Sequence, residues 1–231
     1  LPNGAFELVG GVDPDGRTRA EFMQRTAMPC APDLTTGLEA YRPDVVVVCS
    51  PQEFHQSQVC EAFYHPGVRG VLCEKPMAES VTGCKEMLIA SRGRPLLIAH
   101  QRRYEARHRQ MQEYVRAGGV GTVKSCLARF GGDYLNNGTH AADVCRMMVG
   151  DEIPWTIRGN GVGFDVMVSG DCASVSLSSY GNLSPGYMRE MYDDFAEALQ
   201  RYGRAVECSG EDGMEAVRHA LFAQERDQNA A

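Results

Sequence analysis

A glutamate and a lysine stand side by side at the end of a short apolar run, in the segment Cys73-Glu74-Lys75-Pro76. The end of a buried parallel strand faces the ligand side of a sheet, so these charges are expected beside a binding site. A lysine there can hydrogen-bond a substrate oxygen, and burial would lower its pKa toward a range useful for proton exchange. Pro76 fixes the turn and keeps Lys75 extended. The alternative interpretation is an exposed salt bridge in a loop.

A histidine and an aspartate begin a helix further along the chain, in the segment Asn136-Asn137-Gly138-Thr139-His140-Ala141-Ala142-Asp143. His140 and Asp143 are three residues apart, so their side chains share one face of that helix. A histidine with a nearby carboxylate is suited to act as a general base for an alcohol proton. The alternative is a capping network that only starts the helix.

Residues suited to a dinucleotide follow two other apolar runs. Asp13 ends the first, where a carboxylate can accept hydrogen bonds from the adenosine ribose hydroxyls. Ser50 and Pro51 follow the second and can line the nicotinamide ribose, and His55 is expected to begin the next helix. The alternatives are an aspartate before a proline turn, and a helix cap with a packed histidine. Arg17 could meet a 2′-phosphate, but Asp13 would repel that phosphate, which modestly favours NAD over NADP.

The elements that must position these residues alternate over the first hundred residues. Four continuous apolar runs are typical of strands buried on both faces of a parallel sheet; they are Phe6–Val12, Val45–Cys49, Gly70–Cys73 and Leu96–Ala99. Between them apolar residues recur at helical spacing. Strands separated by helices require right-handed crossovers, so residues 1–104 are predicted to form an α/β, Rossmann-type, doubly wound parallel sheet.

From residue 105 the pattern changes, and residues 105–231 are predicted to form a smaller α+β domain for substrate binding and oligomerisation. Strands are expected over Gly121–Phe130 and Asp165–Tyr180. Helices are expected over Glu105–Ala117 and Thr139–Val149, and roughly over Gly186–Tyr202 and Asp212–Gln224.

Composition narrows the class of protein. The 231 residues are 43% hydrophobic and 23% charged, with a formal net charge of −7 and no Lys/Arg cluster, which argues against a nucleic-acid partner. No apolar run approaches the roughly 20 residues that span a bilayer, so no membrane partner is expected. The nine cysteines lack C-x-x-C or zinc-ligand spacing, so no metal site is predicted. Cys49 and Cys73 end apolar runs, which indicates core thiols in a reducing compartment, the cytoplasm.

These segments occur in an order that resembles the glucose–fructose oxidoreductase / inositol dehydrogenase / rhizopine-catabolism family, usually written Gfo/Idh/MocA. The residues that carry the resemblance are a strand ending in Asp13, a Ser-Pro-x-x-x-His turn at 50–55, Glu-Lys-Pro at 74–76, Arg-Tyr at 103–104, Gly-x-His-x-x-Asp at 138–143 and Ser-Gly-Glu-Asp-Gly at 209–213.

The resemblance implies a Rossmann half followed by a domain with a largely antiparallel sheet, with NAD or NADP in the cleft between them. Lys75 would contact the reacting oxygen, and its peptide to Pro76 would often be cis. His140 would act as or assist the base. Asp143 would bind or orient the substrate, and Arg103 would line its pocket. The implied substrates are sugars, cyclitols or their derivatives.

Three departures from the family pattern are visible. The family has a glycine-rich strand–turn–helix of about 30 residues before the strand ending in Asp13, and it does not precede that strand here. Few residues are left for the strands of the second domain, which predicts omissions near Phe130–Tyr134, Ile153–Gly159 or Tyr180–Ser184. Asn136 stands where many members carry Asp, and an amide cannot take a proton. Any base role would therefore fall on His140, Lys75 or both.

Three functional hypotheses follow. The first is reversible hydride transfer between a secondary alcohol of the substrate and nicotinamide, by a homodimer or homotetramer. It assigns catalysis to Lys75, His140 and Asp143, cofactor binding to Asp13, Ser50, Pro51, His55, Glu74 and Lys75, and substrate binding to Lys75, Arg103, Asn136, His140 and Asp143. The second is a lyase or glycosidase that oxidises transiently and retains its NAD. The third is a truncated or degenerate member that binds sugar or a protein partner without catalysis.

Overall fold

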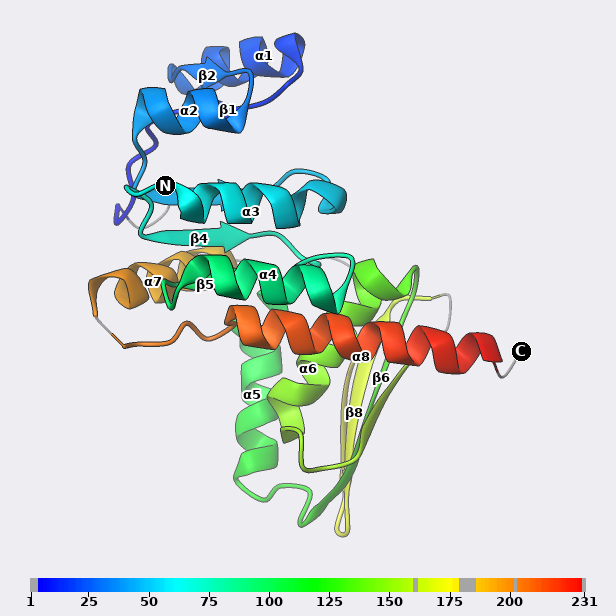
Figure 1. Ribbon diagram of the computed structural model, residues 1–231. Coiled ribbons are helices and arrows are strands. Elements are labelled where there is room, and N and C mark those ends of the chain that lie inside the picture. Colours follow the sequence, from blue (N-terminus) through cyan, green and yellow to red (C-terminus); the bar gives the residue numbers. More distant parts are fainter. Residues whose placement is uncertain (1–3, 160–161, 179–185, 202, 230–231) are drawn as a thin grey trace.

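The first half of the chain alternates strands and helices, as its apolar runs predict (Figure 1). The computed structural model describes residues 4–159, 162–178, 186–201 and 203–229. The strands are β1 (Gly11–Val12), β2 (Cys30–Ala31), β3 (Val45–Val48), β4 (Gly70–Cys73) and β5 (Leu96–Ile98). The helices between them are α1 (Gly16–Thr26), α2 (Leu34–Tyr41), α3 (His55–Tyr64) and α4 (Val81–Ser91). The paired strands among them are all parallel, which confirms the Rossmann-type prediction.

Short polar side chains start three of these helices. Asp15, Asp33 and Ser80 each accept a hydrogen bond from a backbone N–H three residues further on, at 2.8, 2.8 and 3.1 Å. A side-chain oxygen at this position satisfies one of the N–H groups that the first helical turn leaves without a partner. Local sequence therefore fixes where α1, α2 and α4 begin, although the apolar runs alone did not predict α1 and α2.

The five strands form two separate parallel sheets, β1–β2 and β3–β4–β5, where the sequence predicted one. In the described part of the chain no strand pairs with the outer edge of β1 or of β3. Val12 and Val47 are therefore 41% and 45% exposed, so the prediction of burial on both faces is wrong for these two strands. It is correct for β4, whose residues are all buried. The predicted strand Phe6–Val12 is also shorter, because Phe6 leaves it to pack against Phe195, with ring centroids 6.0 Å apart.

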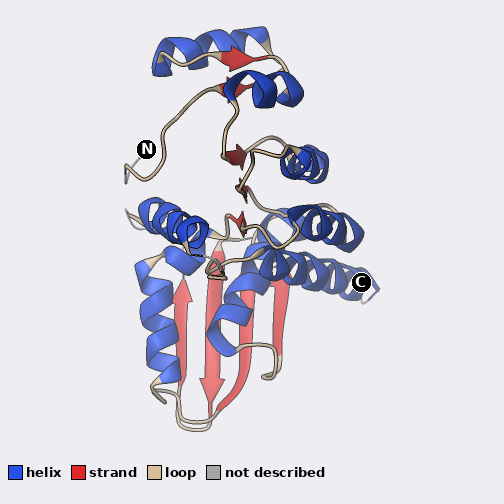
Figure 2. Ribbon diagram, turned by 60° about the vertical axis from the view of Figure 1, so that its left-hand side comes forward, coloured by secondary structure: helices blue, strands red, loops and turns tan. Residues whose placement is uncertain are grey.

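The second half forms a four-stranded sheet with helices over one face (Figure 2). Its elements are α5 (Ala106–Arg116), β6 (Val123–Phe130), α6 (Thr139–Val149), β7 (Trp155–Gly159), β8 (Phe164–Gly170) and β9 (Ser174–Ser178). The order is β7-β6-β8-β9, with β6–β7 parallel and the other pairs antiparallel, so the largely antiparallel sheet is confirmed.

Two expectations for this sheet need revision. The predicted strand Asp165–Tyr180 is the hairpin of β8 and β9, because the chain reverses between Gly170 and Ser174; Tyr180 lies outside the described residues, as does the suspected omission at Tyr180–Ser184. The stretch Ile153–Gly159, also suspected of an omission, contributes β7, so short strands account for more of this domain than the sequence suggested. Whether residues are omitted stays a prediction.

The last two helices, α7 (Tyr187–Gln200) and α8 (Gly210–Asn229), pack against the first half of the chain. Met191 and Phe195 of α7 bury one face of the β3–β4–β5 sheet, and α8 runs along both α4 and α6 (Figure 1). Gly213 allows this approach, since a Cβ there would come within 2.6 Å of Ile98. A domain boundary at residue 104 stays a prediction, and these helices cross it.

All nine cysteines are free, and five of them are buried. Cys73 is a core thiol, as predicted, but Cys49 is exposed. The reason is its place after the edge strand β3, whose outer side no described strand covers. Among the described residues we find no helix with the length and apolar character required for a bilayer span.

Candidate active site

The residues predicted to bind a cofactor lie at the carboxyl edge of the parallel strands. Asp13, Ser50 and Glu74 follow the ends of β1, β3 and β4. The buried ring of His55 lies between two of these loops, with Nδ1 2.8 Å from the backbone oxygen of Pro76 and Nε2 2.9 Å from that of Ser50. One imidazole thus fastens the loop after β3 to the loop after β4. Helix α3 begins at His55, as predicted.

The free polar groups at this edge fit the ribose ends of a dinucleotide. The side chain of Asp13 accepts one hydrogen bond, from the backbone N–H of Asp15 at 2.8 Å, which leaves its second oxygen available for a ribose hydroxyl. The hydroxyl of Ser50 donates to Gln58 at 2.7 Å, which holds the Ser-Pro turn in place. Arg17, the candidate partner of a 2′-phosphate, pairs with Glu21 at 3.2 Å. A glycine-rich turn for the pyrophosphate is not found among the described elements.

Lys75 reaches from this edge to the second half of the chain. The Lys75–Pro76 peptide is cis, as the resemblance implies. The Lys75 ammonium donates to the side-chain oxygen of Asn136 and, at 3.3 Å, to its backbone carbonyl. Burial lowers the pKa of Lys75, against the opposing charge of Glu74. Because Asn136 lies one helical turn before His140, this contact brings the lysine and the histidine together.

His140 lies against a second histidine, which the sequence analysis did not single out. The Nδ1 atoms of His140 and His100 are 3.3 Å apart, and the rings meet edge to face. Burial lowers the pKa of His100 to about 4. Burial, with the positive charge of Arg102, lowers the pKa of His140 well below that of a free imidazole. Both rings are therefore neutral at pH 7, and one donates to the other.

The tautomer decides what His140 can do. If its Nδ1–H donates to His100, its Nε2 is an acceptor, as a general base requires. A positional signal for His100 was present in the sequence, because it follows β5 just as Glu74 follows β4.

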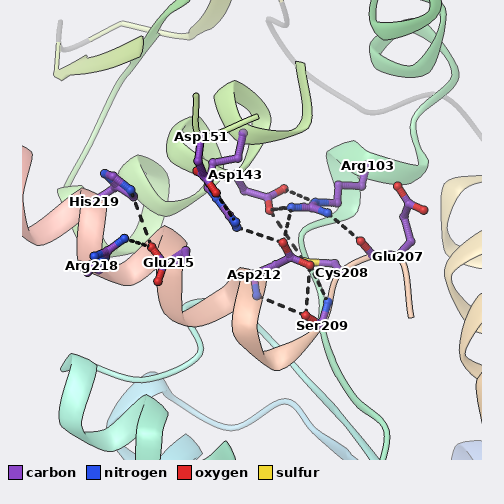
Figure 3. Close-up of polar contacts among 11 residues, drawn as sticks. Arg103, Asp143, Asp151, Glu207, Cys208, Ser209, Asp212, Glu215, Arg218 and His219 are labelled. Atoms are coloured by element: carbon purple, nitrogen blue, oxygen red, sulfur yellow. Dashed lines mark hydrogen bonds and ion pairs between the residues drawn. The ribbon is translucent and has the colours of Figure 1, made fainter. Parts of the chain in front are cut away.

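Asp143, unlike His140, lies in a network of ion pairs (Figure 3). Arg103 holds its carboxylate with Nε at 2.9 Å and Nη2 at 2.7 Å, and Nη2 is also 3.2 Å from Asp212. The Nη1 of Arg103 donates to the backbone oxygen of Glu207 at 2.6 Å. All three guanidinium nitrogens are therefore engaged, and the network ties α6 to the start of α8. Contact of Arg103 or Asp143 with a substrate stays a prediction.

Arg102 is the charged residue of this region that sequence reasoning missed. Its guanidinium lies 4.0 Å from the centre of the Phe164 ring, and its positive charge acts on both Lys75 and His140. Local sequence does not distinguish Arg102 from Arg103, since both follow β5.

The site as a whole combines an ammonium, a neutral imidazole and a free guanidinium where the two halves of the chain meet. An ammonium can hydrogen-bond an alcohol or carbonyl oxygen, and a neutral imidazole can take or return its proton. These are the two operations that interconversion of an alcohol and a ketone requires of a protein. The catalytic roles of Lys75, His140 and Asp143 stay predictions.

Comparison with known proteins identifies relatives. Residues 2–100 match the model of the oxidoreductase family with an NAD-binding Rossmann fold, GFO_IDH_MocA. Inositol 2-dehydrogenase 3 of Saccharopolyspora erythraea is 32% identical over 131 residues, which are 53% of this chain and 37% of that enzyme. D-glucoside 3-dehydrogenase of Escherichia coli K12 is 35% identical over 94 residues, which are 40% of this chain and 26% of that enzyme.

Solved structures with a similar fold share less of the sequence. The crystal structure of GenD2 from gentamicin A biosynthesis, in complex with NAD, superposes with a TM-score of 0.82 and 17% identity, covering 97% of this chain and 88% of that one. This similarity supports the fold. The curated relatives match over about a third of their own length, 37% and 26% for the two enzymes above.

Proposed function

Because this chain belongs to the Gfo/Idh/MocA family of oxidoreductases, as its resemblance predicts, we propose that it transfers hydride reversibly between a secondary alcohol and a nicotinamide cofactor. The alcohol would belong to a sugar, a cyclitol or a sugar derivative, since two matched relatives are named for inositol and a glucoside. One observation carries the proposal. It is the hydrogen bond from Lys75 to Asn136, which joins the cofactor edge to the turn before His140.

The chain's own residues would manage the oxygen and its proton. A bound nicotinamide would supply the acceptor for the hydride of the carbinol carbon, and the protein would then have to take one proton from the hydroxyl. His140 accepts that proton at Nε2 while its Nδ1–H donates to His100. Lys75 donates a hydrogen bond to the same oxygen and stabilises the negative charge that develops there. In the reverse direction the proton returns from His140 to the oxygen.

Asn136 would position the lysine and take no part in proton transfer. Its amide oxygen accepts from Lys75 and holds the ammonium at the turn before His140. Asp143 and Arg103 would set the orientation of α6, on which His140 stands, and we retain them as candidates to bind substrate hydroxyls. Ser50, Pro51 and Glu74 would line the nicotinamide ribose, and Asp13 would hold the adenosine ribose. His55 would act on the cofactor only through the two loops that it joins.

The test is a screen of the full chain with NAD and with NADP against myo-inositol, methyl glucosides and free sugars, read by the absorbance of reduced nicotinamide. We expect reduction with at least one of them, and faster with NAD because the Asp13 carboxylate disfavours a 2′-phosphate. Failure to bind either cofactor in titration calorimetry would overturn the proposal. Cofactor that stays bound through purification and is not turned over would favour transient oxidation followed by elimination or hydrolysis.

We also propose that the protein acts in the cytoplasm as a homodimer or homotetramer. Nine free cysteines support a reducing compartment. The sheet of the second half, with helices packed over one face, supports self-association through the other (Figure 2). Cell fractionation and light scattering of the purified chain test the two statements separately.

A further inference from the structure

Three buried side-chain nitrogens have no hydrogen-bond partner within the described residues, and they fall in one place. They are Nε2 of His100, Nε of Arg102 and Nε2 of His108. The three residues run from the end of β5 into α5, and each acts electrostatically on His140. Buried polar atoms almost always have partners, because a buried donor or acceptor without one is destabilising. These nitrogens therefore leave unfilled hydrogen-bonding capacity beside the proposed catalytic residues.

Arg102 is the charged member of this group. Its guanidinium stacks on Phe164 at 4.0 Å, which fixes the plane of the group, and it forms no ion pair with any described residue. Burial lowers the pKa of Arg102 to about 10, so it stays charged at neutral pH.

The two carboxylates that act on Arg102 electrostatically are both engaged elsewhere. Glu105 is paired with Arg107 at 2.8 Å and with His108 at 2.6 Å. Asp143 is held by Arg103 at 2.7 Å. The positive charge of Lys75 is opposed by Glu74 and Asp133, but the charge of Arg102 acts on His140 with no free carboxylate to balance it. A ligand that carries negative charge would supply that balance.

We propose that Arg102 binds an anionic group of the substrate, a carboxylate or a phosphate, beside the carbinol that Lys75 and His140 hold. The planar fork of a guanidinium matches two oxygens of either group. This inference rests on the proposed function for the position of the reacting carbon, but the anion site itself can be tested without turnover. It makes a sugar acid or a sugar phosphate the preferred substrate class, over a neutral sugar.

The first experiment measures the affinity of the full chain for D-glucuronate, D-glucose 6-phosphate and D-glucose by titration calorimetry. We expect at least one of the two anions to bind ten or more times more tightly than glucose, with a preference that weakens as salt increases. Stronger binding of glucuronate assigns a carboxylate, and stronger binding of the phosphate ester assigns a phosphate. Equal affinity for all three overturns the inference without reference to any variant.

The second experiment assigns the site to Arg102. Arg102→Gln should reduce the preference for the anion at least tenfold, and Arg102→Lys, which keeps the charge but not the fork, should reduce it less. Arg109→Gln, at a half-exposed arginine of α5 that pairs with the exposed Glu190, is the matched control and should keep the preference. Thermal unfolding of each variant checks that it is folded. An anion preference that survives in folded Arg102→Gln assigns the anion to another group and overturns the proposal.

The outcomes also separate this inference from the proposed function. Arg102-dependent anion binding without reduction of NAD or NADP would support the anion site and contradict the oxidoreductase proposal. Reduction of cofactor by neutral sugars, with no preference for an anion, would support the oxidoreductase proposal and contradict the anion site.

Discussion

His140 and Asp143 stand three residues apart on α6, yet the two regions that they face differ in how their polar groups are paired. On what we call the paired side, Asp143, Arg103 and Asp212 satisfy one another through ion pairs of 2.7 to 3.2 Å. On the unpaired side, His140 faces His100 and Arg102, both of which keep a buried nitrogen without a partner. The paired side is built to hold α6 in place, and the unpaired side keeps the hydrogen-bonding capacity that we assign to a ligand.

Burial and charge alone therefore do not identify the groups that react with a substrate. Arg103 is as buried and as charged as a substrate-binding arginine would be, but every nitrogen of its guanidinium already has a partner. Unfilled hydrogen-bonding capacity is the more informative signal, because a ligand can bind only where donors and acceptors remain free. Four predictions test this contrast.

The largest expected effect is on activity, at Lys75, whose charge acts on His140 of the unpaired side. Lys75→Met should lower kcat/KM by about 10²–10⁴-fold, the usual contribution of a positioned acid–base group. The free energy of unfolding should change by less than about 1 kcal/mol, because Lys75 is only partly buried and its one side-chain partner is exposed. Steady-state rates and urea unfolding measure the two quantities. An unaltered rate would remove Lys75 from the mechanism.

The next effect is on stability, at the paired side. Arg103→Met should lower the free energy of unfolding by about 3–5 kcal/mol, because it leaves the carboxylate of Asp143 buried with no cation opposite it. The double variant with Asp143→Leu should recover most of that loss, since no charge is then left without a partner. Arg17→Gln, whose partner Glu21 is exposed, serves as the control. If the single variant loses less than about 1 kcal/mol, the paired side does not hold α6 as we infer.

The third effect is a dependence of stability on pH that comes from the unpaired side. The pKa of His100 is about 4 in the folded protein, against 6.5 for an ordinary histidine, so the unfolded chain binds the proton first as the pH falls. The contribution of neutral His100 to the free energy of unfolding is therefore fully present above pH 6.5. It decreases toward pH 4, by about 3 kcal/mol. His140 should add to the loss in the same direction.

Urea unfolding between pH 7 and pH 4 measures this dependence. The matched variant His100→Leu cannot take up that proton, so its stability should decrease less over the same range. If the stability of the variant depends on pH as steeply as that of the wild type, other groups cause the acid sensitivity.

The smallest effect concerns the contact between the two histidines. His100→Leu removes the hydrogen bond at Nδ1 of His140, a contact of about 1 kcal/mol, so kcat should fall by about three- to tenfold with a smaller change in KM. His100→Asn, which can still accept from His140, should restore part of the rate. A shift of the acid limb of the pH–rate profile in both variants would identify His100 as a positioning residue. Equal losses in the two variants, with no such shift, would indicate a packing role alone.

Much of the fold and part of the site could be predicted from the sequence, because the relevant signals are local. Continuous apolar runs located β4 and β5, and helical spacing located α5 and α6. The charged pair after β4 indicated Lys75, because the end of a parallel strand meets the ligand side of a sheet. The separation of β1 from β3 was not predictable, since strand pairing depends on which edges meet and not on the residues of either strand alone.

Local sequence was enough to identify the residues that could do chemistry: Lys75 after a buried strand, and His140 at the start of a helix. The pairing of the neighbouring arginines depends on the folded chain, in which Asp143 and the backbone of Glu207 hold Arg103 while Arg102 stays unpaired. The physical reason is that two adjacent arginines have the same charge and the same local sequence. The partners of Arg103 lie 40 and 104 residues away along the chain, so only the folded arrangement of distant segments can distinguish the two arginines.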